Sequence, residues 1–456
     1  MRGLWFESAL LPQGWARQVR LTASDGRIAQ VTTGVTPGAD DERHRIALPG
    51  LPNLHSHAFQ RGLAGLTERR GAQGDSFWTW RELMYRFVER LDPEQLEALS
   101  ALAFVEMLEA GFTHVGEFHY LHHDRDGAPF ADPAELAGRV VAAAAAAGIG
   151  LTLLPTLYAH GGFGGAPPSA RQRRFITDPE RFARLVEASR KAVSSLAFGS
   201  CGVAAHSLRA VTPAELAAVV TLSGGGVMHL HIAEQTREVE ECVAWCGRRP
   251  VEWLLENCPV DERWCLVHAT HASGAELREV ASRGAVVGLC PVTEASLGDG
   301  IFPAGEFLGA GGRIGIGSDS NIRVDAAEEL RTLEYSQRLA LRSRNVLAGA
   351  PGASTGRSLF ELALAGGWQA LRPGGPGGAP GIAPGAPFDV VTLAAASVDL
   401  VGREGDELLD SWVFAGGRGL VDCVWRAGVR LVSGGRHRER AGIERRYGAA
   451  LRALLA

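Results

Sequence analysis

The sequence predicts an α/β fold: a (β/α)8 TIM-like barrel with a small β-sandwich domain built from both chain ends. Short apolar runs alternate with helical stretches in the middle of the chain, eight such runs occur, and both flanks are instead strand-like with turn signals. Near-continuous apolar strands that alternate with helices are typical of a parallel sheet covered on both faces. Eight units over about 270 residues fit a closed barrel, for which roughly 250 residues is typical. The pattern alone leaves an open doubly wound sheet as the alternative.

The eight apolar runs are rich in Val, Ile and Leu, and helical candidates such as residues 179–197 separate them. We expect each run to form one strand of the barrel, in chain order. The runs are residues 47–54, 112–118, 150–157, 198–205, 227–232, 264–269, 285–290 and 313–318.

The two ends of the chain are expected to meet in one small domain. The predicted domain limits are 1–46 and 379–435 for the small β-sandwich, 47–378 for the catalytic barrel, and 436–456 for a C-terminal helix. Residues 372–387, between barrel and tail, are rich in Gly and Pro, which suits a connector rather than a packed element.

Composition excludes several function classes. The 456 residues carry a formal net charge of −5, so neither nucleic acid nor an anionic membrane is an expected partner. Lys191 is the only lysine, which excludes a phosphate-binding loop of the Gly-x4-Gly-Lys type. Only Lys191 is available to form a Schiff base or to bridge two metals as a carboxylated lysine.

The most apolar stretch, residues 140–154, is too short to span a bilayer. The seven cysteines lack framework spacing, so we expect a cytoplasmic protein with reduced thiols.

Histidines follow two of the predicted strands, at the end where barrels of this type carry their active residues. His55 and His57 come after the first strand, and because side chains alternate along an extended chain, both imidazoles point to the same side. The fifth strand carries His229 and His231, which share a face, so that either one can be a metal ligand.

Two further polar residues end strands of the same barrel. His268 ends the sixth predicted strand, and Asp319 follows the eighth. Alone, His268 is typical of a hydrogen-bonded core histidine, and Asp319 could cap the next helix. The recurrence of such residues at the same end of several strands is stronger evidence for a shared site than either residue alone. Three imidazole nitrogens and a carboxylate suit Zn²⁺ or a related divalent ion.

These residues resemble the amidohydrolase superfamily, and the resemblance covers the whole chain. Glu234, three residues after His231, is similar to the His-x-x-Glu signature of its mononuclear deaminase branch, whose members use one metal and no bridging lysine. Within that branch, several segments resemble the formimidoylglutamate deiminases. These segments include residues 51–66 with the word FQRG, 116–123 with EFHY, 204–211 with HSLR and 231–235 with HIAEQ. The resemblance implies a barrel of the metal-dependent hydrolase type.

The resemblance also implies a role for each site residue. It assigns one divalent metal, with Zn²⁺ expected and Fe²⁺ or Mn²⁺ also compatible, to His55, His57, His231 and Asp319. It makes Glu234, His268 and Asp319 the catalytic residues: Glu234 carries a proton, His268 contacts the attacking water, and Asp319 accepts a proton. The implied substrate contacts are Gln60, Arg81, Tyr120, His206 and Arg209.

The implied reaction is the hydrolysis of N-formimino-L-glutamate to N-formyl-L-glutamate and ammonia, in the degradation of histidine, by a homodimer. The alternatives are a related deaminase of a nucleobase or of another amidine or guanidine, and a non-catalytic relative. The absence of an obvious aromatic stacking pair near the motifs favours a small dicarboxylate over a flat base.

Without the resemblance, Arg81 would be interpreted as a surface residue. We expect His122 and His123 to be solvated, and Glu117 either to orient a neighbour or to join a buried ion pair.

Overall fold

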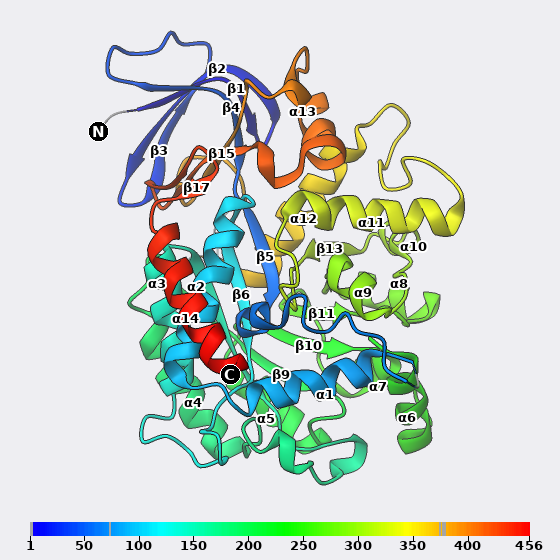
Figure 1. Ribbon diagram of the computed structural model, residues 1–456. Helices are drawn as coiled ribbons and strands as arrows, with labels where there is room; N and C mark the ends of the chain where they lie inside the picture. Colours follow the sequence, from blue (N-terminus) through cyan, green and yellow to red (C-terminus); the bar gives the residue numbers. More distant parts are fainter. Residues whose placement is uncertain (1–2, 73, 374, 376–379) are drawn as a thin grey trace.

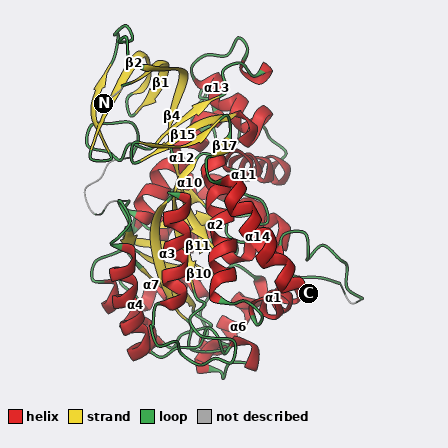
Figure 2. Ribbon diagram, turned by 60° about the vertical axis from the view of Figure 1, so that its left-hand side comes forward, coloured by secondary structure: helices red, strands yellow, loops and turns green. Residues whose placement is uncertain are grey.

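A computed structural model describes residues 3–456, apart from residues 73, 374 and 376–379. It confirms the fold class: a parallel barrel surrounded by helices, with a second sheet from both chain ends above it (Figure 1; Figure 2). The predicted limit at residue 379 lies outside the described residues, and the domain limits as a whole stay a prediction. In the described part of the chain, no helix combines the length and the apolar character needed to cross a membrane.

The strands of the barrel are parallel and follow the chain order. They are β5 (Leu51–Ser56), β6 (Phe112–His119), β7 (Gly150–Leu157), β9 (Val203–Ser207), β10 (Met228–Ile232), β11 (Trp264–His268), β12 (Val286–Leu289) and β13 (Arg313–Ile316). The short β8 (Ser200–Cys201) pairs with β7, so the predicted run 198–205 is divided between two strands.

The barrel closes between the carboxyl ends of β5 and β13. Ser318 N and Asp319 N both donate to His55 O, at 3.1 and 3.0 Å, and His57 N donates to Asp319 O at 2.9 Å. A parallel bridge joins Ser56 to Asp319. The open sheet that the sequence left as an alternative is therefore excluded.

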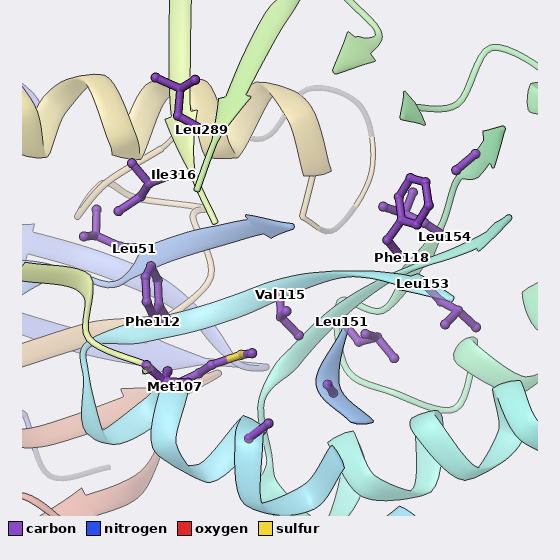
Figure 3. Packing of buried hydrophobic residues seen from close by; sticks show 14 of the residues in the cluster. Leu51, Met107, Phe112, Val115, Phe118, Leu151, Leu153, Leu154, Leu289 and Ile316 are labelled. Atoms are coloured by element: carbon purple, nitrogen blue, oxygen red, sulfur yellow. The ribbon is translucent and has the colours of Figure 1, made fainter. Parts of the chain in front are cut away.

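Burial on both faces explains why the strands are apolar almost throughout. Every residue of β6 and of β7 is buried. Phe112, Val115 and Leu151 belong to the main hydrophobic cluster, together with Met107 from the covering helix α2 (Figure 3). A parallel sheet with helices on its outside has no solvated face on which polar residues could alternate.

Helices cover the barrel, and local signals set where many of them begin. Asp92 caps α2: its Oδ1 accepts Gln95 N at 2.7 Å, Gln95 Oε1 accepts Asp92 N at 3.0 Å, and Pro93 takes the first helical position. The helices are α1 (Phe77–Val88), α2 (Pro93–Glu109), α3 (Glu135–Ala147), α4 (Pro179–Val193), α5 (Pro213–Ser223), α6 (Thr236–Cys246), α7 (Pro250–Asn257), α8 (Gly274–Ser282), α9 (Pro291–Leu297), α10 (Ala304–Gly309), α11 (Ala326–Leu341), α12 (Thr355–Leu371), α13 (Asp406–Ser411) and α14 (Arg440–Leu455).

The second sheet is continuous and takes four strands from each end of the chain. Its order is β17-β16-β15-β14-β4-β1-β2-β3, and β4 pairs with β14 to join the two halves. Side chains from both halves, Phe6 and Trp425 among them, pack into one small hydrophobic cluster. The strands are β1 (Leu4–Leu11), β2 (Gly14–Ser24), β3 (Arg27–Thr32), β4 (Glu42–Pro49), β14 (Val390–Leu393), β15 (Val421–Arg426), β16 (Val429–Ser433) and β17 (Arg436–His437).

The predicted first strand, 47–54, crosses from one sheet to the other, which corrects its interpretation as a single strand. β4 ends at Pro49 in the small sheet, and β5 begins at Leu51 in the barrel. Gly50 lies between them, where a Cβ atom would stand 2.3 Å from the side chain of Thr113. Only glycine fits this crossing, and an apolar run carries no signal of a change of sheet.

The C-terminal part of the predicted connector, residues 380–387, and the residue that follows it pack against the small sheet. Ile382 and Phe388 belong to the cluster of the small sheet, and Ile28 N donates to Ala386 O at 2.8 Å. The C-terminal helix α14 packs against α2, where Arg440 Nη1 lies 2.7 Å from Glu109 Oε2 (Figure 2).

Helix α12 packs closely against the barrel through two glycines. A Cβ atom on Gly366 would stand 2.0 Å from Ile314 O, and one on Gly367 would stand 2.9 Å from Pro52 Cβ. At its end, Ala370 O accepts a hydrogen bond from His229 Nε2 at 2.9 Å.

We predict that Gly366→Ala lowers the free energy of unfolding by about 1–3 kcal/mol, because the backbone of β13 must move to admit the methyl group. Gly138→Ala in α3 is the matched control: nothing lies within 4 Å of its added Cβ. Alanine there should be neutral, or stabilising by roughly 0.5–1 kcal/mol. Thermal unfolding of both variants at one scan rate is the measurement, and equal melting temperatures would contradict the close packing.

Candidate active site

Three imidazoles and one carboxylate converge where the barrel closes. The ligand atoms of His55, His57, His231 and Asp319 all lie within 4.8 Å of one another, and all four residues are buried. His57 Nε2 and His55 Nε2 lie 3.3 and 3.4 Å from Asp319 Oδ1. His231 Nε2 lies 3.0 Å from His55 Nε2. The sequence predicted these four residues as a set, and the structure brings them together.

In His57 and His231 the Nδ1 atom is engaged in a hydrogen bond, which leaves the Nε2 atom free to bind a metal. His57 Nδ1 donates to Phe118 O at 2.9 Å, and His231 Nδ1 donates to His206 O at 3.0 Å. Burial lowers the pKa of His57 to about 3 and lowers the pKa values of His55 and His231 as well, so the rings are neutral. Neutral imidazoles whose other nitrogen donates to a carbonyl are the usual ligands of divalent metals. The donor set therefore fits a divalent ion such as zinc.

The sequence left His229 and His231 as alternative ligands on the fifth strand, and the structure places only one of them in the cluster. His231, the penultimate residue of β10, joins the cluster, whereas the ring of His229, two residues earlier, is hydrogen-bonded elsewhere. There its Nε2 donates to Ala370 O, at the end of α12. His229 therefore holds α12 against the barrel.

His268 lies between three carboxylates beside the cluster. Its Nε2 is 3.8 Å from both Glu234 Oε1 and Asp319 Oδ2, and its Nδ1 is 3.1 Å from Glu294 Oε1. Burial opposes a charge on His268, but these carboxylates raise its pKa to about 10. Burial also raises the pKa of Glu234 to about 7, although His268 and Arg209 counteract it. Proton-carrying groups thus face the cluster from one side.

Glu294 and Glu238 are two site residues that sequence reasoning missed. Glu294 lies in the first turn of α9, directly after the seventh barrel strand, and that position was the available signal. Glu238 is fully buried and accepts hydrogen bonds from Ala233 N at 3.2 Å and from Glu234 N at 3.1 Å. It thereby holds the turn that presents Glu234.

A cavity opens beside the cluster, and all five predicted substrate contacts line it. Gln60 Nε2 donates to Tyr120 Oη at 2.9 Å on its wall. Five aromatic side chains also line the cavity, which corrects the expectation that no aromatic pair lies near the motifs. They are Phe77, Trp80, Tyr85, Tyr120 and Tyr158. The sequence could not show this, because α1 brings three of them from outside the motifs.

Arg81 and Arg209 stand on the wall of this cavity without an anionic partner. Within the described residues, no carboxylate oxygen lies within 4 Å of either guanidinium group, and the Nε atom of each is buried without a hydrogen-bond partner. Arg209 is 7% exposed, and Arg81 is half-buried. Arg81 therefore lies on the cavity wall, where the resemblance places it as a substrate contact.

Three residues left open or interpreted as solvated are buried. His122 Nε2 donates to Thr156 O and His123 Nε2 to Ile176 O, both at 2.8 Å, so the expectation of solvated loop residues was wrong. Glu117 Oε1 accepts Ala58 N at 2.7 Å, and burial raises the pKa of Glu117 to about 8. Glu117 therefore holds the backbone next to His57, and it forms no ion pair with any residue that the structure describes.

Comparisons with known proteins agree with this site. Residues 46–431 match the model of the amidohydrolase family, and residues 1–45 match the model of the N-terminal domain of formimidoylglutamate deiminase HutF. The formimidoylglutamate deiminase of Pseudomonas aeruginosa is 52% identical over 456 residues, which is 100% of this chain and 99% of that protein. The 8-oxoguanine deaminase of the same organism is 29% identical over 342 residues, 70% of this chain and 71% of that protein.

Among solved structures, an amidohydrolase from Brucella melitensis is 55% identical, covers 100% of both chains and superposes with a TM-score of 0.96. The chain therefore belongs to the amidohydrolase family and, within it, to the formimidoylglutamate deiminases.

Proposed function

We propose that this protein hydrolyses the amidine group of N-formimino-L-glutamate, giving N-formyl-L-glutamate and ammonia. One observation carries the proposal: a single cavity joins a His/His/His/Asp cluster to two arginines that lack carboxylate partners. The first group suits metal-assisted hydrolysis, and the second suits a substrate with two carboxylates. The relative with 52% identity, named formimidoylglutamate deiminase, supports the same substrate.

The four clustered residues, His55, His57, His231 and Asp319, would hold one divalent ion, and we propose Zn²⁺, with Fe²⁺ or Mn²⁺ as alternatives. When bound, such an ion supplies a Lewis acid and lowers the pKa of a water from 15.7 towards about 7. A second ion is not proposed, because Lys191 is exposed on α4 and β9 ends instead in His206 and Ser207.

The proton transfers fall to the groups beside the cluster. Asp319 Oδ2 takes a proton from the attacking water, and Glu234 passes a proton to the nitrogen that leaves as ammonia. Positioned proton transfer of this kind typically contributes about 10²–10⁴-fold to the rate. His268, fixed by Glu294, donates a hydrogen bond to the oxygen of the tetrahedral centre. The carbon–nitrogen bond to the terminal nitrogen breaks, and the hydroxyl proton of the tetrahedral centre passes back to Glu234 as the carbon–oxygen double bond forms. The proton held by Asp319 leaves with ammonia as ammonium, and the formyl group stays on glutamate.

The glutamate part of the substrate would lie against the arginine-bearing wall. A guanidinium group matches a carboxylate in two parallel hydrogen bonds, so Arg81 and Arg209 can each bind one carboxylate. Gln60, Tyr120 and His206 add polar contacts nearer the cluster.

We also propose a cytoplasmic homodimer. The seven cysteines are free, which is typical of proteins in a reducing compartment. The homodimer is an expectation from the family resemblance, and sedimentation would test it.

Turnover of N-formimino-L-glutamate should release ammonia in proportion to bound metal. Removal of the metal with a strong chelator should abolish activity and leave the far-ultraviolet circular dichroism unchanged, because the barrel has its own core. The measurement is ammonia release with metal analysis of the same sample, and 8-oxoguanine serves as the competing substrate. Ammonia release from 8-oxoguanine alone would favour the nucleobase alternative, and full activity without metal would overturn the mechanism.

Glu234→Gln should keep the metal but lower kcat by about 10²–10⁴-fold, because the amide cannot carry the proton. Glutamine preserves the shape of the side chain, so metal content and melting temperature are the controls. A kcat near that of the unmodified enzyme would remove Glu234 as the proton carrier.

Arg81→Met and Arg209→Met should each raise KM about 10- to 100-fold, the range expected for losing a charge-assisted hydrogen bond. Arg86→Met on the exposed side of α1 is the matched control and should leave KM unchanged. An unaltered KM in either variant would exclude that arginine from substrate binding.

A further inference from the structure

Three guanidinium groups gather around one indole ring at the arginine-bearing wall. The Cζ atoms of Arg237, Arg81 and Arg209 lie 4.5, 4.6 and 5.5 Å from the centroid of Trp78. Trp78 and Arg81 belong to α1, Arg209 follows β9, and Arg237 lies in the first turn of α6. One ring therefore connects α1 with two separate parts of the barrel.

Like charges gathered on one ring repel, and the carboxylates of Glu238 and Glu234 offset this only for Arg209, whose pKa they raise without forming an ion pair within 4 Å. Arg81 and Arg209 have no carboxylate oxygen within 4 Å in the described part of the chain, whereas Arg237 pairs with the half-buried Glu241 at 2.6 Å. A cation in the first turn of a helix also opposes the helix dipole. The negative face of the indole is the attractive element that all three guanidinium groups share.

Trp78 does not itself line the cavity. Its neighbours in the chain, Phe77 and Trp80, line the cavity, but Trp78 is not among the described residues that do so. In Figure 1, α1 lies across the end of the barrel remote from the small sheet. The ring can thus orient the arginines without lining the cavity, while their Nε atoms stay free of protein partners.

We propose that Trp78 is a positioning residue for substrate recognition: its indole holds the guanidinium groups of Arg81 and Arg209 in place for the two carboxylates of a dianionic substrate. Arg237 is the third cation of this stack and ties α1 to α6. The inference rests on the proposed function, because it takes the dicarboxylate from there. It adds that the two arginines are aligned before the substrate arrives, by an aromatic ring rather than by carboxylates.

The test compares Trp78→Leu, Trp78→Phe and the control Leu83→Ala, which changes an exposed residue of the same helix. Trp78→Leu should raise KM for N-formimino-L-glutamate about 5- to 30-fold with kcat within about threefold, because only carboxylate binding is disturbed. Trp78→Phe keeps an aromatic face and should restore KM to within about threefold. Formamidine, an amidine without carboxylates, should be hydrolysed equally by all variants.

Binding of N-formyl-L-glutamate, measured by calorimetry, provides a readout that needs no turnover. Trp78→Leu should weaken this binding as much as it raises KM. Unchanged affinity in Trp78→Leu beside weakened affinity in Arg81→Met would overturn the role of Trp78 and leave the proposed function intact. Unchanged affinity in both variants would count against the proposed function itself. An equal loss of formamidine turnover in Trp78→Leu would show structural damage and would also overturn the inference.

Discussion

The closure of the barrel is the contact on which the rest of the site depends. The hydrogen bonds that join the ends of β5 and β13 involve the backbones of three candidate ligands and the neighbouring Ser318: Ser318 N and Asp319 N donate to His55 O, and His57 N donates to Asp319 O. Closing the sheet therefore places the carboxylate of Asp319 against two imidazoles in the same step. The cluster needs no separate scaffold, because the hydrogen bonds that make the sheet a barrel also fix its ligands. A strand pair that failed to close would lose both the fold and the site.

Several residues with a strained backbone conformation lie at the same strand ends. Ala233, His268, Ala269 and Asp319 have φ values of +49°, +69°, +48° and +43°. Non-glycine residues in this region cost about 1–3 kcal/mol each and persist only where their surroundings impose the conformation. At Ala233, the surroundings are the carboxylate of Glu238, which accepts two successive backbone N–H groups. At Asp319, they are the hydrogen bonds of barrel closure. Glycine would relieve the strain at His268 and Asp319 but would remove the side chains that the site needs.

The sequence was sufficient to predict the barrel and the strand ends that carry candidate ligands, because both follow from short-range rules, whereas the set of four ligands came from the family resemblance. Strands buried on both faces must be apolar, and two histidines spaced by two on an extended chain must share a side. Other features depend on partners distant in the chain. His229 and His231 cannot be ranked locally, since the choice depends on a carbonyl of α12, 141 residues from His229. The change of sheet at Gly50 depends on Thr113, and the aromatic wall depends on where α1 packs. Pattern and periodicity carry no information on such contacts.

The charge distribution of the cavity explains why a linear amidine dicarboxylate suits it better than a nucleobase does. Near the cluster the charged side chains are mostly carboxylates: Asp319, Glu234 and Glu294 face His268. On the other wall Arg81 and Arg209 carry positive charge without carboxylate partners within 4 Å. An amidine is a strong base and enters as a cation, whereas the glutamate part of the same molecule carries two negative charges. The aromatic lining is compatible with a flat base, but a base offers no anion to the arginines, which would then line the occupied cavity without a carboxylate within hydrogen-bond distance. The separation of charge within the cavity, more than its shape, is therefore what matches the substrate.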